Sequence, residues 1–260
     1  MFGKSEVIEI KSVDELALMR EAGLVVARTL EKLRSEITVG MTTADLDAIA
    51  RDSIASFGAT PSFLGYHGFP AAICTSINRE VVHGIPSDVP ISDSDIVSID
   101  CGAIVEGWHG DAAISILMPQ ASASVVALSE ATKTALWAGI AQAREGQRLS
   151  DIGHAVETCI RSAGSYGIVE DYVGHGIGSA MHMHPPVPNY GKPGRGPRLE
   201  AGMALAIEPM ATMGEATVAV LEDEWTVVTM DGQPAAHWEH TVAITDEGPW
   251  VLTSLEGTRL

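Results

Sequence analysis

The segment IVSIDCGAIVEGWHGDAAISIL, residues 96–117, contains two apolar runs separated by a turn near Val105, Glu106 and Gly107. This pattern predicts a β-hairpin with strands at residues 96–104 and 111–117. Asp100 and Asp111 stand one on each strand, and a hairpin centred on the turn would place them opposite each other. Directly opposed residues of an antiparallel pair have Cβ atoms about 4.5–5.5 Å apart, and like charges there repel. A cation between them would remove the repulsion.

Three further candidate metal ligands follow along the chain, at His175, Glu208 and Glu239. His175 stands in a run that has glycine at positions 174, 176 and 178, and glycine lets the backbone approach a ligand closely. With Asp100 and Asp111, these residues could hold two divalent metal ions side by side. One imidazole among carboxylates suits Co, Mn, Fe or Zn, so the ligands do not identify the metal.

Composition limits the function classes. A chain of 260 residues with 46% hydrophobic content can bury a full core, in one large domain or two small ones. Its net charge of −18 disfavours binding to nucleic acid or to an anionic membrane. Residues 1–6 lead into charged sequence without the apolar stretch of a signal peptide, and no later stretch approaches a membrane span. Three widely spaced cysteines fit a reducing compartment, so we expect a cytoplasmic protein.

Caps and apolar periodicity predict four helices. Ser12 and Glu15 form a capping-box pattern for a helix that ends near residues 37–40. The other helices are expected at residues 43–57, 122–145 and 150–163, each followed by glycine. Strands are expected at residues 71–77, 96–104, 111–117, 203–213, 224–230 and 237–244. This mixture predicts an α+β fold.

The chain also resembles itself at an offset of 106 residues, which suggests two related halves at about residues 1–135 and 136–260 of a single domain. The alternative is that glycine and aspartate simply recur near helix ends. The glycine- and proline-rich residues 185–198 are interpreted as a surface loop and not as a boundary. The matched pairs are Gly40 and Gly146, Asp45 and Asp151, Leu46 and Ile152, Ile54 and Ile160, Ser56 and Ser162, Gly58 and Gly164, Tyr66 and Tyr172, and Gly68 and Gly174.

Six segments together resemble the bacterial type I methionine aminopeptidases, a family of "pita-bread" metalloenzymes. They are residues 82–86, 98–102, 109–111, 172–190, 206–210 and 238–241. The resemblance covers nearly the whole chain. It implies a pita-bread fold of two pseudo-symmetric halves, with antiparallel sheet inside and helices packed outside. It also implies metal-dependent removal of the N-terminal methionine from nascent proteins and peptides whose second residue is small.

The resemblance assigns roles to the candidate residues. One metal would be held by Asp111, His175, Glu208 and Glu239, and the other by Asp100, Asp111 and Glu239. Two such cations can activate a water molecule and polarise the scissile carbonyl. Glu208 would carry the proton from the water to the leaving amine. Two histidines would contact the substrate, His83 at the leaving nitrogen and His182 at the developing oxyanion.

A pocket for the methionine side chain should be apolar and tolerant of sulfur. The family pattern places its walls at residues that include Phe63, where a cysteine is common, and Met181, where an aromatic is common. The implied partners are N-termini of nascent polypeptides, with a transient ribosome contact made by the catalytic domain of a monomer. The predicted substrate-binding residues are Phe63, Tyr66, Phe69, Cys74, His83, Met181, His182 and Trp225.

Two alternatives remain open from the sequence. A prolidase or Xaa-Pro aminopeptidase would share the metal ligands, but such enzymes usually carry an extra N-terminal domain, for which this chain has no room before Asp100. A non-catalytic pita-bread binding module would recognise proteins or peptides without metals. All five ligands are present here, and clustered carboxylates are costly to keep without a cation.

Overall fold

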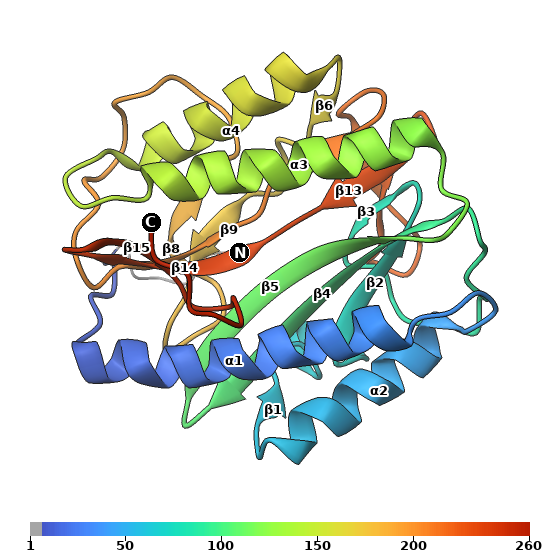
Figure 1. Cartoon of the computed structure of the whole chain (residues 1–260), viewed down its shortest axis with the longest axis horizontal. Coiled ribbons are helices and arrows are strands. Elements are labelled where there is room, and N and C mark those ends of the chain that lie inside the picture. The colour runs from blue at the N-terminus through green and yellow to red at the C-terminus, as the bar shows by residue number, and fades with distance from the viewer. Residues whose placement is uncertain (1–6) are drawn as a thin grey trace.

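The computed structural model describes residues 7–260, so residues 1–6, on which the expectation about a signal peptide rests, lie outside the described residues. Within residues 7–260, the chain forms two pairs of consecutive α-helices, one short 3-10 helix, η1, and a series of strands (Figure 1). None of the helices in residues 7–260 has the length and apolar content needed to cross a membrane. The helices are α1 (Val13–Glu36), α2 (Thr43–Ser56), η1 (Tyr66–Gly68), α3 (Ala123–Gln142) and α4 (Leu149–Ala163).

Antiparallel sheets lie between two helical layers, with α1 and α2 on one side and α3 and α4 on the other (Figure 1). In the first sheet, β4 (Ile96–Val105) pairs with β1 (Thr60–Pro61), β2 (Ile73–Ile77) and β5 (Trp108–Leu117). The five-stranded sheet has the order β15 (Gly248–Val251), β14 (His240–Thr245), β9 (Ala204–Ile207), β7 (Gly174–Gly176) and β8 (Met183–Val187).

Two smaller sheets complete the interior. One has the order β13 (Ala235–His237), β10 (Met210–Thr212) and β6 (Gly167–Ile168). The other has the order β11 (Val218–Val220), β12 (Val227–Thr229) and β3 (Glu80–Val82). The predicted α+β class, with helices outside antiparallel sheet, is confirmed.

The predicted hairpin forms, but its register differs from the expected one. A two-residue loop, Glu106 (φ 49°) and Gly107 (φ 86°), joins β4 to β5. Positive φ at both positions is typical of the tight turn that matches the twist of paired strands. This turn pairs Asp111 with Gly102 and Asp100 with Ala113, so the expectation that the two aspartates are directly opposed is wrong by two residues. A shift of two keeps both side chains on the same face of the sheet as diagonal neighbours.

Two predicted continuous strands are interrupted in the structure. The strand expected at residues 203–213 breaks at Glu208 and Pro209, between β9 and β10. The strand expected at residues 237–244 breaks at Trp238 and Glu239, between β13 and β14. Proline offers no N–H to a sheet, and each chain segment leaves one sheet and enters another at its break. Both breaks contain a predicted metal ligand.

The helix predictions hold within a few residues. Ser12 caps α1 with the predicted capping box. The third helix ends at Gln142, before the expected residue 145, because Ala143 leaves the helical conformation. The strand expected at residues 224–230 is shorter, at Val227–Thr229, and the short strands β1, β3, β6, β7, β8, β11 and β15 were not predicted. Segments this short carry too little periodicity to be recognised in sequence.

The self-similar helices α2 and α4 begin 106 residues apart with the same N-terminal hydrogen bond. The side chains of Asp45 and Asp151 each accept from the backbone N–H of the N-cap residue, at 2.8 Å in both. Their C-termini differ, since Gly58 has φ 70° and Gly164 is extended. The matching N-termini favour two related halves, at about residues 1–135 and 136–260. The division into halves stays a prediction.

Helix α1 contacts β5 through backbone at Gly23 and Gly110. A Cβ atom added to Gly110 would lie 2.7 Å from the Gly23 nitrogen, and one added to Gly23 would lie 2.3 Å from the Leu252 carbonyl oxygen. Real Cβ atoms do not approach backbone so closely, so neither position has room for a side chain. This contact fixes the strand that carries Asp111.

We expect Gly110→Ala to lower the free energy of unfolding by about 2–3 kcal/mol, because the added methyl group must displace helix backbone. Chemical denaturation measures this change. Glu21→Ala, an exposed substitution on the same helix, is the matched control and should change stability by about 0.5 kcal/mol or less. Equal stability of Gly110→Ala and the control would show that α1 and β5 are not in backbone contact.

Candidate metal centre

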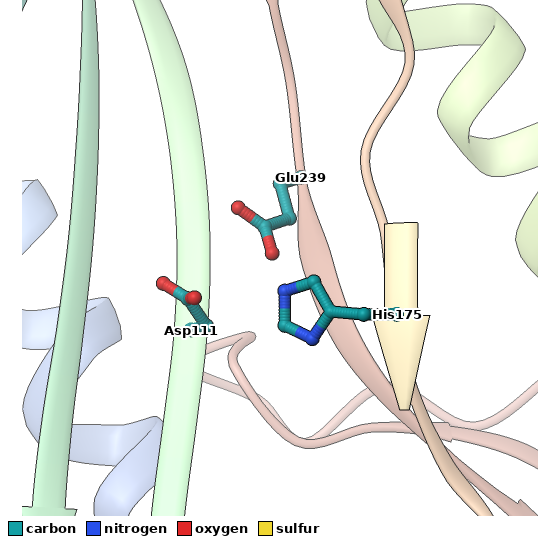
Figure 2. A group of neighbouring side chains, drawn as sticks. All are labelled: Asp111, His175 and Glu239. Carbon is teal, nitrogen blue, oxygen red and sulfur yellow. The ribbon is translucent and has the colours of Figure 1, made fainter. Parts of the chain in front are cut away.

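Asp111, His175 and Glu239 meet in the interior (Figure 2). Each offers a ligand atom, and these atoms all lie within 4.8 Å of one another. Asp111 comes from β5, His175 from the middle of β7, and Glu239 from the break between β13 and β14. The three residues are only 2–4% exposed. An acid–imidazole–acid group this compact has the residue types and spacing of a divalent metal site.

The two other predicted ligands adjoin this group. Asp100 lies on β4, diagonal to Asp111. Glu208 follows β9, and its Oε1 atom is 3.6 Å from His175 Nε2. All five residues line one cavity of about 380 Å³. The structure therefore brings together every residue for which metal binding was predicted.

Several oxygens of these carboxyl groups lack protein partners. Asp100 Oδ1, Asp111 Oδ1 and Glu239 Oε1 are buried atoms without a hydrogen-bond partner among the described residues. Burial, followed by repulsion from neighbouring carboxylates, raises the pKa of Asp100, Glu208 and Glu239 well above the usual range. Burial raises the pKa of Asp111 to about 7. Unsatisfied buried carboxylates are costly, and divalent cations would satisfy them, so these residues fit metal ions.

His175 is oriented to present one particular nitrogen. Its Nδ1 atom lies 2.9 Å from the Gly176 carbonyl oxygen, to which it can donate a hydrogen bond. The lone pair is then on Nε2, the atom nearest Glu208. Burial lowers the pKa of His175 to about 4, so the ring is neutral at neutral pH. A neutral imidazole with a free Nε2 is the form that binds metal.

Hydrogen bonds between distant strands hold the acidic residues in place. The N–H of Asp111 donates to the Thr241 hydroxyl at 3.0 Å, and that hydroxyl donates to the Asp111 carbonyl oxygen at 2.8 Å. The N–H of Glu239 donates to the Ala113 carbonyl oxygen at 2.9 Å. Strand β5 is thereby joined to residues 239–241, which lie about 130 positions later in the chain. Sheet hydrogen bonds in this region and the geometry of the centre depend on each other.

His237 also faces the acidic group, which sequence reasoning did not foresee. Its Nε2 atom is 3.7 Å from Glu208 Oε2 and 4.0 Å from Glu239 Oε2, and it is buried without a hydrogen-bond partner among the described residues. The available signal was strand periodicity, since residues two apart on a strand share a face and His237 precedes Glu239 by two. At these distances His237 can orient the carboxylates.

An apolar wall forms the other side of the cavity. Buried Phe63, Phe69, Cys74 and Met181 pack together, with Trp225 against them. The Phe69 and Trp225 rings meet edge to face, with centroids 5.1 Å apart. The predicted pocket residues thus lie beside the acidic group, and their substrate contacts stay a prediction. The cavity is also lined by residues that were not predicted, which are His67, Asp171, Tyr172 and Val173.

The two predicted catalytic histidines line the same cavity. His83 follows β3 with φ 60°, and its ring meets that of Tyr172 at 5.5 Å. The His182 ring lies 4.3 Å from the His175 ring, and its Nδ1 atom is 2.8 Å from the Tyr66 hydroxyl. Both rings line the cavity that the acidic group lines, as a role in catalysis requires.

Comparison with known proteins agrees with this geometry. The profile of metallopeptidase family M24 matches residues 17–246. "Methionine aminopeptidase 1" of Mycobacterium tuberculosis is 54% identical over 253 residues, covering 95% of this chain and 95% of that protein. The crystal structure of methionine aminopeptidase from Thermotoga maritima has a TM-score of 0.93 and 40% identity, covering 95% of this chain and 100% of that chain. Prolidase from Pyrococcus furiosus has a TM-score of 0.74 at 22% identity, covering 94% of this chain and 65% of that one.

The chain belongs to metallopeptidase family M24. Within that family, its similar full-length relatives carry the name methionine aminopeptidase, so the resemblance found in the sequence is confirmed. The pita-bread fold is confirmed as well. The prolidase likeness, at 22% identity, concerns the fold alone.

Stability of the metal-free protein should fall as pH rises from about 7.5 to 8.5. In this range the histidines of the unfolded state, with a usual pKa of about 6.5, are largely neutral, and burial keeps those of the metal centre neutral in the folded state. The carboxyl groups of Asp100, Glu208 and Glu239, whose pKa values burial raises well above the usual range, then bind protons only in the folded state. The unfolded state then binds fewer protons, and stability decreases with pH. Melting temperatures of chelated and Mn²⁺-loaded protein measure this, and the difference between them should widen with pH.

Asp100→Asn supplies the control for this pH dependence. It removes one of the coupled carboxyl groups while keeping its size, so the slope for the metal-free variant should be shallower. A metal-free wild type whose stability stays constant or rises across this range would contradict the account of unsatisfied carboxylates.

Proposed function

We propose that this chain is a metal-dependent aminopeptidase that removes the N-terminal methionine from polypeptides whose second residue is small. It is a hydrolase of family M24 whose curated relatives are methionine aminopeptidases at high identity over nearly the full chain. One observation carries the proposal: a single cavity joins an acidic wall with His175 to an apolar wall with Met181. The first wall suits metal-assisted hydrolysis, and the second suits a methionine side chain.

Two divalent cations would be held by the five ligands, with Asp111 and Glu239 shared between them. The number and the element are part of the proposal, and the unpartnered oxygens of Asp100, Asp111 and Glu239 support it. When bound, such ions supply Lewis acidity toward water and toward the scissile carbonyl. Co, Mn, Fe and Zn are all compatible with these ligands.

The side chains of the chain itself would do the rest. Glu208 would take a proton on a carboxylate oxygen and return it to the leaving amine. His182 would donate from Nε2 to the carbonyl oxygen as it gains charge, because Nδ1 is engaged with the Tyr66 hydroxyl. His83 would hydrogen-bond the leaving nitrogen. The pocket of Phe63, Tyr66, Phe69, Cys74, Met181 and Trp225 would exclude water around the methionine side chain.

The proposal also covers the natural substrates, the partners and the cellular compartment of the enzyme. We expect the substrates to be N-termini of nascent polypeptides, met during transient ribosome contact by a monomeric, cytoplasmic enzyme. Three free cysteines within the described residues support a reducing compartment. The net charge of −18 argues against direct binding to nucleic acid or to an anionic membrane.

Neither alternative accounts for the chain as well. Likeness to a prolidase stands at 22% identity, against 54% for a methionine aminopeptidase. A binding module without metals would have to keep the buried oxygens of Asp100, Asp111 and Glu239 unpartnered, at a cost in stability. Both considerations favour the enzyme.

Release of free methionine from synthetic peptides tests the function. Met-Ala-Ser should be cleaved at least about 100-fold faster than Met-Arg-Ser, since the cavity of about 380 Å³ is crowded by rings at the substrate side. Chelation should abolish turnover, and Co²⁺ or Mn²⁺ should restore it. Cleavage of Met-Arg-Ser as fast as Met-Ala-Ser, or full activity in metal-free protein, would contradict the proposal. Asp111→Ala should be more harmful than Asp100→Ala, since it removes a ligand shared by both ions.

Two nearby histidines should behave differently. His182→Ala should lower kcat by on the order of 10²–10³, the usual effect of losing one oxyanion donor, with metal content unchanged. His184→Ala should keep most activity, because His184 lies on β8 and is not among the described residues that line the cavity. Steady-state kinetics and metal analysis of both variants measure this. Equal losses of kcat, or loss of metal from His182→Ala, would show that the roles are misassigned.

A further inference from the structure

Residues 7–12, which precede α1, lie against the loop of residues 178–180. The backbone N–H of Ser179 donates to Glu9 Oε1 at 3.2 Å, and its hydroxyl donates to Glu9 Oε2. This loop joins His175, a predicted metal ligand, to Met181 and His182. The carboxylate of Glu9 therefore holds a loop that links a predicted metal ligand to residues predicted to face the substrate.

A buried lysine completes this contact. Lys11 is 6% exposed, and its Nζ atom lies 3.3 Å from Glu9 Oε1 and 3.3 Å from the Glu9 carbonyl oxygen. The N–H of Lys11 donates to the Gly202 carbonyl oxygen at 2.8 Å. Burying an ammonium group is unfavourable unless it is paired, and Glu9 supplies the charge. The Glu9 carboxylate thus forms an ion pair with Lys11 and accepts hydrogen bonds from Ser179.

Gly178 shows how closely the loop packs on this ion pair. A Cβ atom at this position would lie 2.3 Å from Glu9 Oε1 and 2.4 Å from Lys11 Cε. On its other side, the Gly178 carbonyl oxygen accepts from the His109 N–H at 3.0 Å. His109 lies on β5, two residues before Asp111. The loop is therefore held between residues 7–12 and the strand of the metal centre.

We propose that Glu9, Lys11 and Ser179 are positioning residues that set the place of His182 in the cavity. This inference rests on the proposed function of His182 as a donor to the substrate carbonyl. The ring end of His182 is held by Tyr66, at 2.8 Å. The backbone of His182 follows the loop of residues 178–180, which Glu9 contacts through Ser179. With both ends fixed, Nε2 stays where the developing oxyanion needs it, and a shift of about 1 Å at such a donor can cost about 10²-fold in rate.

Ser179→Ala tests the proposal with little risk to folding, because Ser179 is exposed and the Glu9–Lys11 pair remains intact. The variant should lower kcat for Met-Ala-Ser by about 10-fold, with KM within about two-fold and metal content unchanged. Its melting temperature should stay within about 2 °C of the wild type. Amide hydrogen exchange of residues 178–182 in the metal-free protein should become at least about five-fold faster.

Two further variants serve as controls. Ser179→Thr keeps the hydroxyl donor and should return kcat to within about three-fold of the wild type. Ser35→Ala removes an exposed hydroxyl that donates to the Lys32 carbonyl oxygen on α1, and it should change neither kcat nor exchange at residues 178–182. Failure of Ser179→Thr to restore kcat would overturn the assignment to the hydroxyl.

The remaining outcomes also decide the question. Unchanged kcat in Ser179→Ala would overturn the proposal, and so would reduced kcat without faster exchange, because the loop would then not be the element that Glu9 holds. If the wild type released no methionine, the proposed function would fail. Exchange at residues 178–182 would still support or refute the contact with Glu9, since it needs no turnover.

Discussion

Ionised carboxylates that share a buried cavity repel one another unless a cation lies between them, and the arrangement of this chain follows from that constraint. Asp111 and Glu239 are almost fully buried, with Asp100 and Glu208 beside them, and several of their oxygens have no protein partner among the described residues. Among residues 7–260, no lysine or arginine lines the cavity. Two buried histidines adjoin the carboxylates, and burial lowers their pKa values, to about 4 for His175 and about 3 for His237. Without metal, the carboxyl groups would have to bind protons to lose their charge, and divalent cations would balance that charge directly. Metal binding and a stable interior are therefore linked in the proposed site.

The ligands stand where strands change sheets, and this explains how distant segments meet. Glu208 lies in the break between β9 and β10, and Glu239 lies in the break between β13 and β14. The strands that flank one break pair with the strands that flank the other, β9 with β14 and β10 with β13. Because a break frees backbone groups from the ladder, the N–H of Glu239 can pair across to Ala113 on β5. The backbone hydrogen bonds that join these sheets therefore also set the spacing of the acidic side chains. A substitution that disturbs sheet pairing here would also disturb the metal site.

The sequence predicted which residues line the candidate site better than it predicted how those residues are arranged. Helix α1 and the hairpin were predictable because their signals are local: a capping box at Ser12, and a glycine-containing turn between two apolar runs. The grouping of the five proposed ligands was predictable because acidic residues in apolar strands are few. The register of Asp100 against Asp111 was not, since it depends on which two residues form the turn. Likewise His237 and the contact of Glu9 with Ser179 depend on tertiary packing, which joins residues 170 positions apart in the second case.

The acidic and apolar walls of the cavity are built from neighbouring positions, so recognition and chemistry are structurally coupled. Cys74 of the apolar wall pairs directly with Asp100 of the acidic wall, on strands β2 and β4. Met181 and His182 are consecutive, and the His182 ring reaches back to contact His175. A methionine side chain that displaces the pocket wall would thus move the same strands and loop that carry the reacting groups. Binding energy from a non-reacting side chain can be used to position the reacting centre. If the apolar pocket binds the methionine side chain as proposed, this adjacency should give it an effect on kcat as well as on KM.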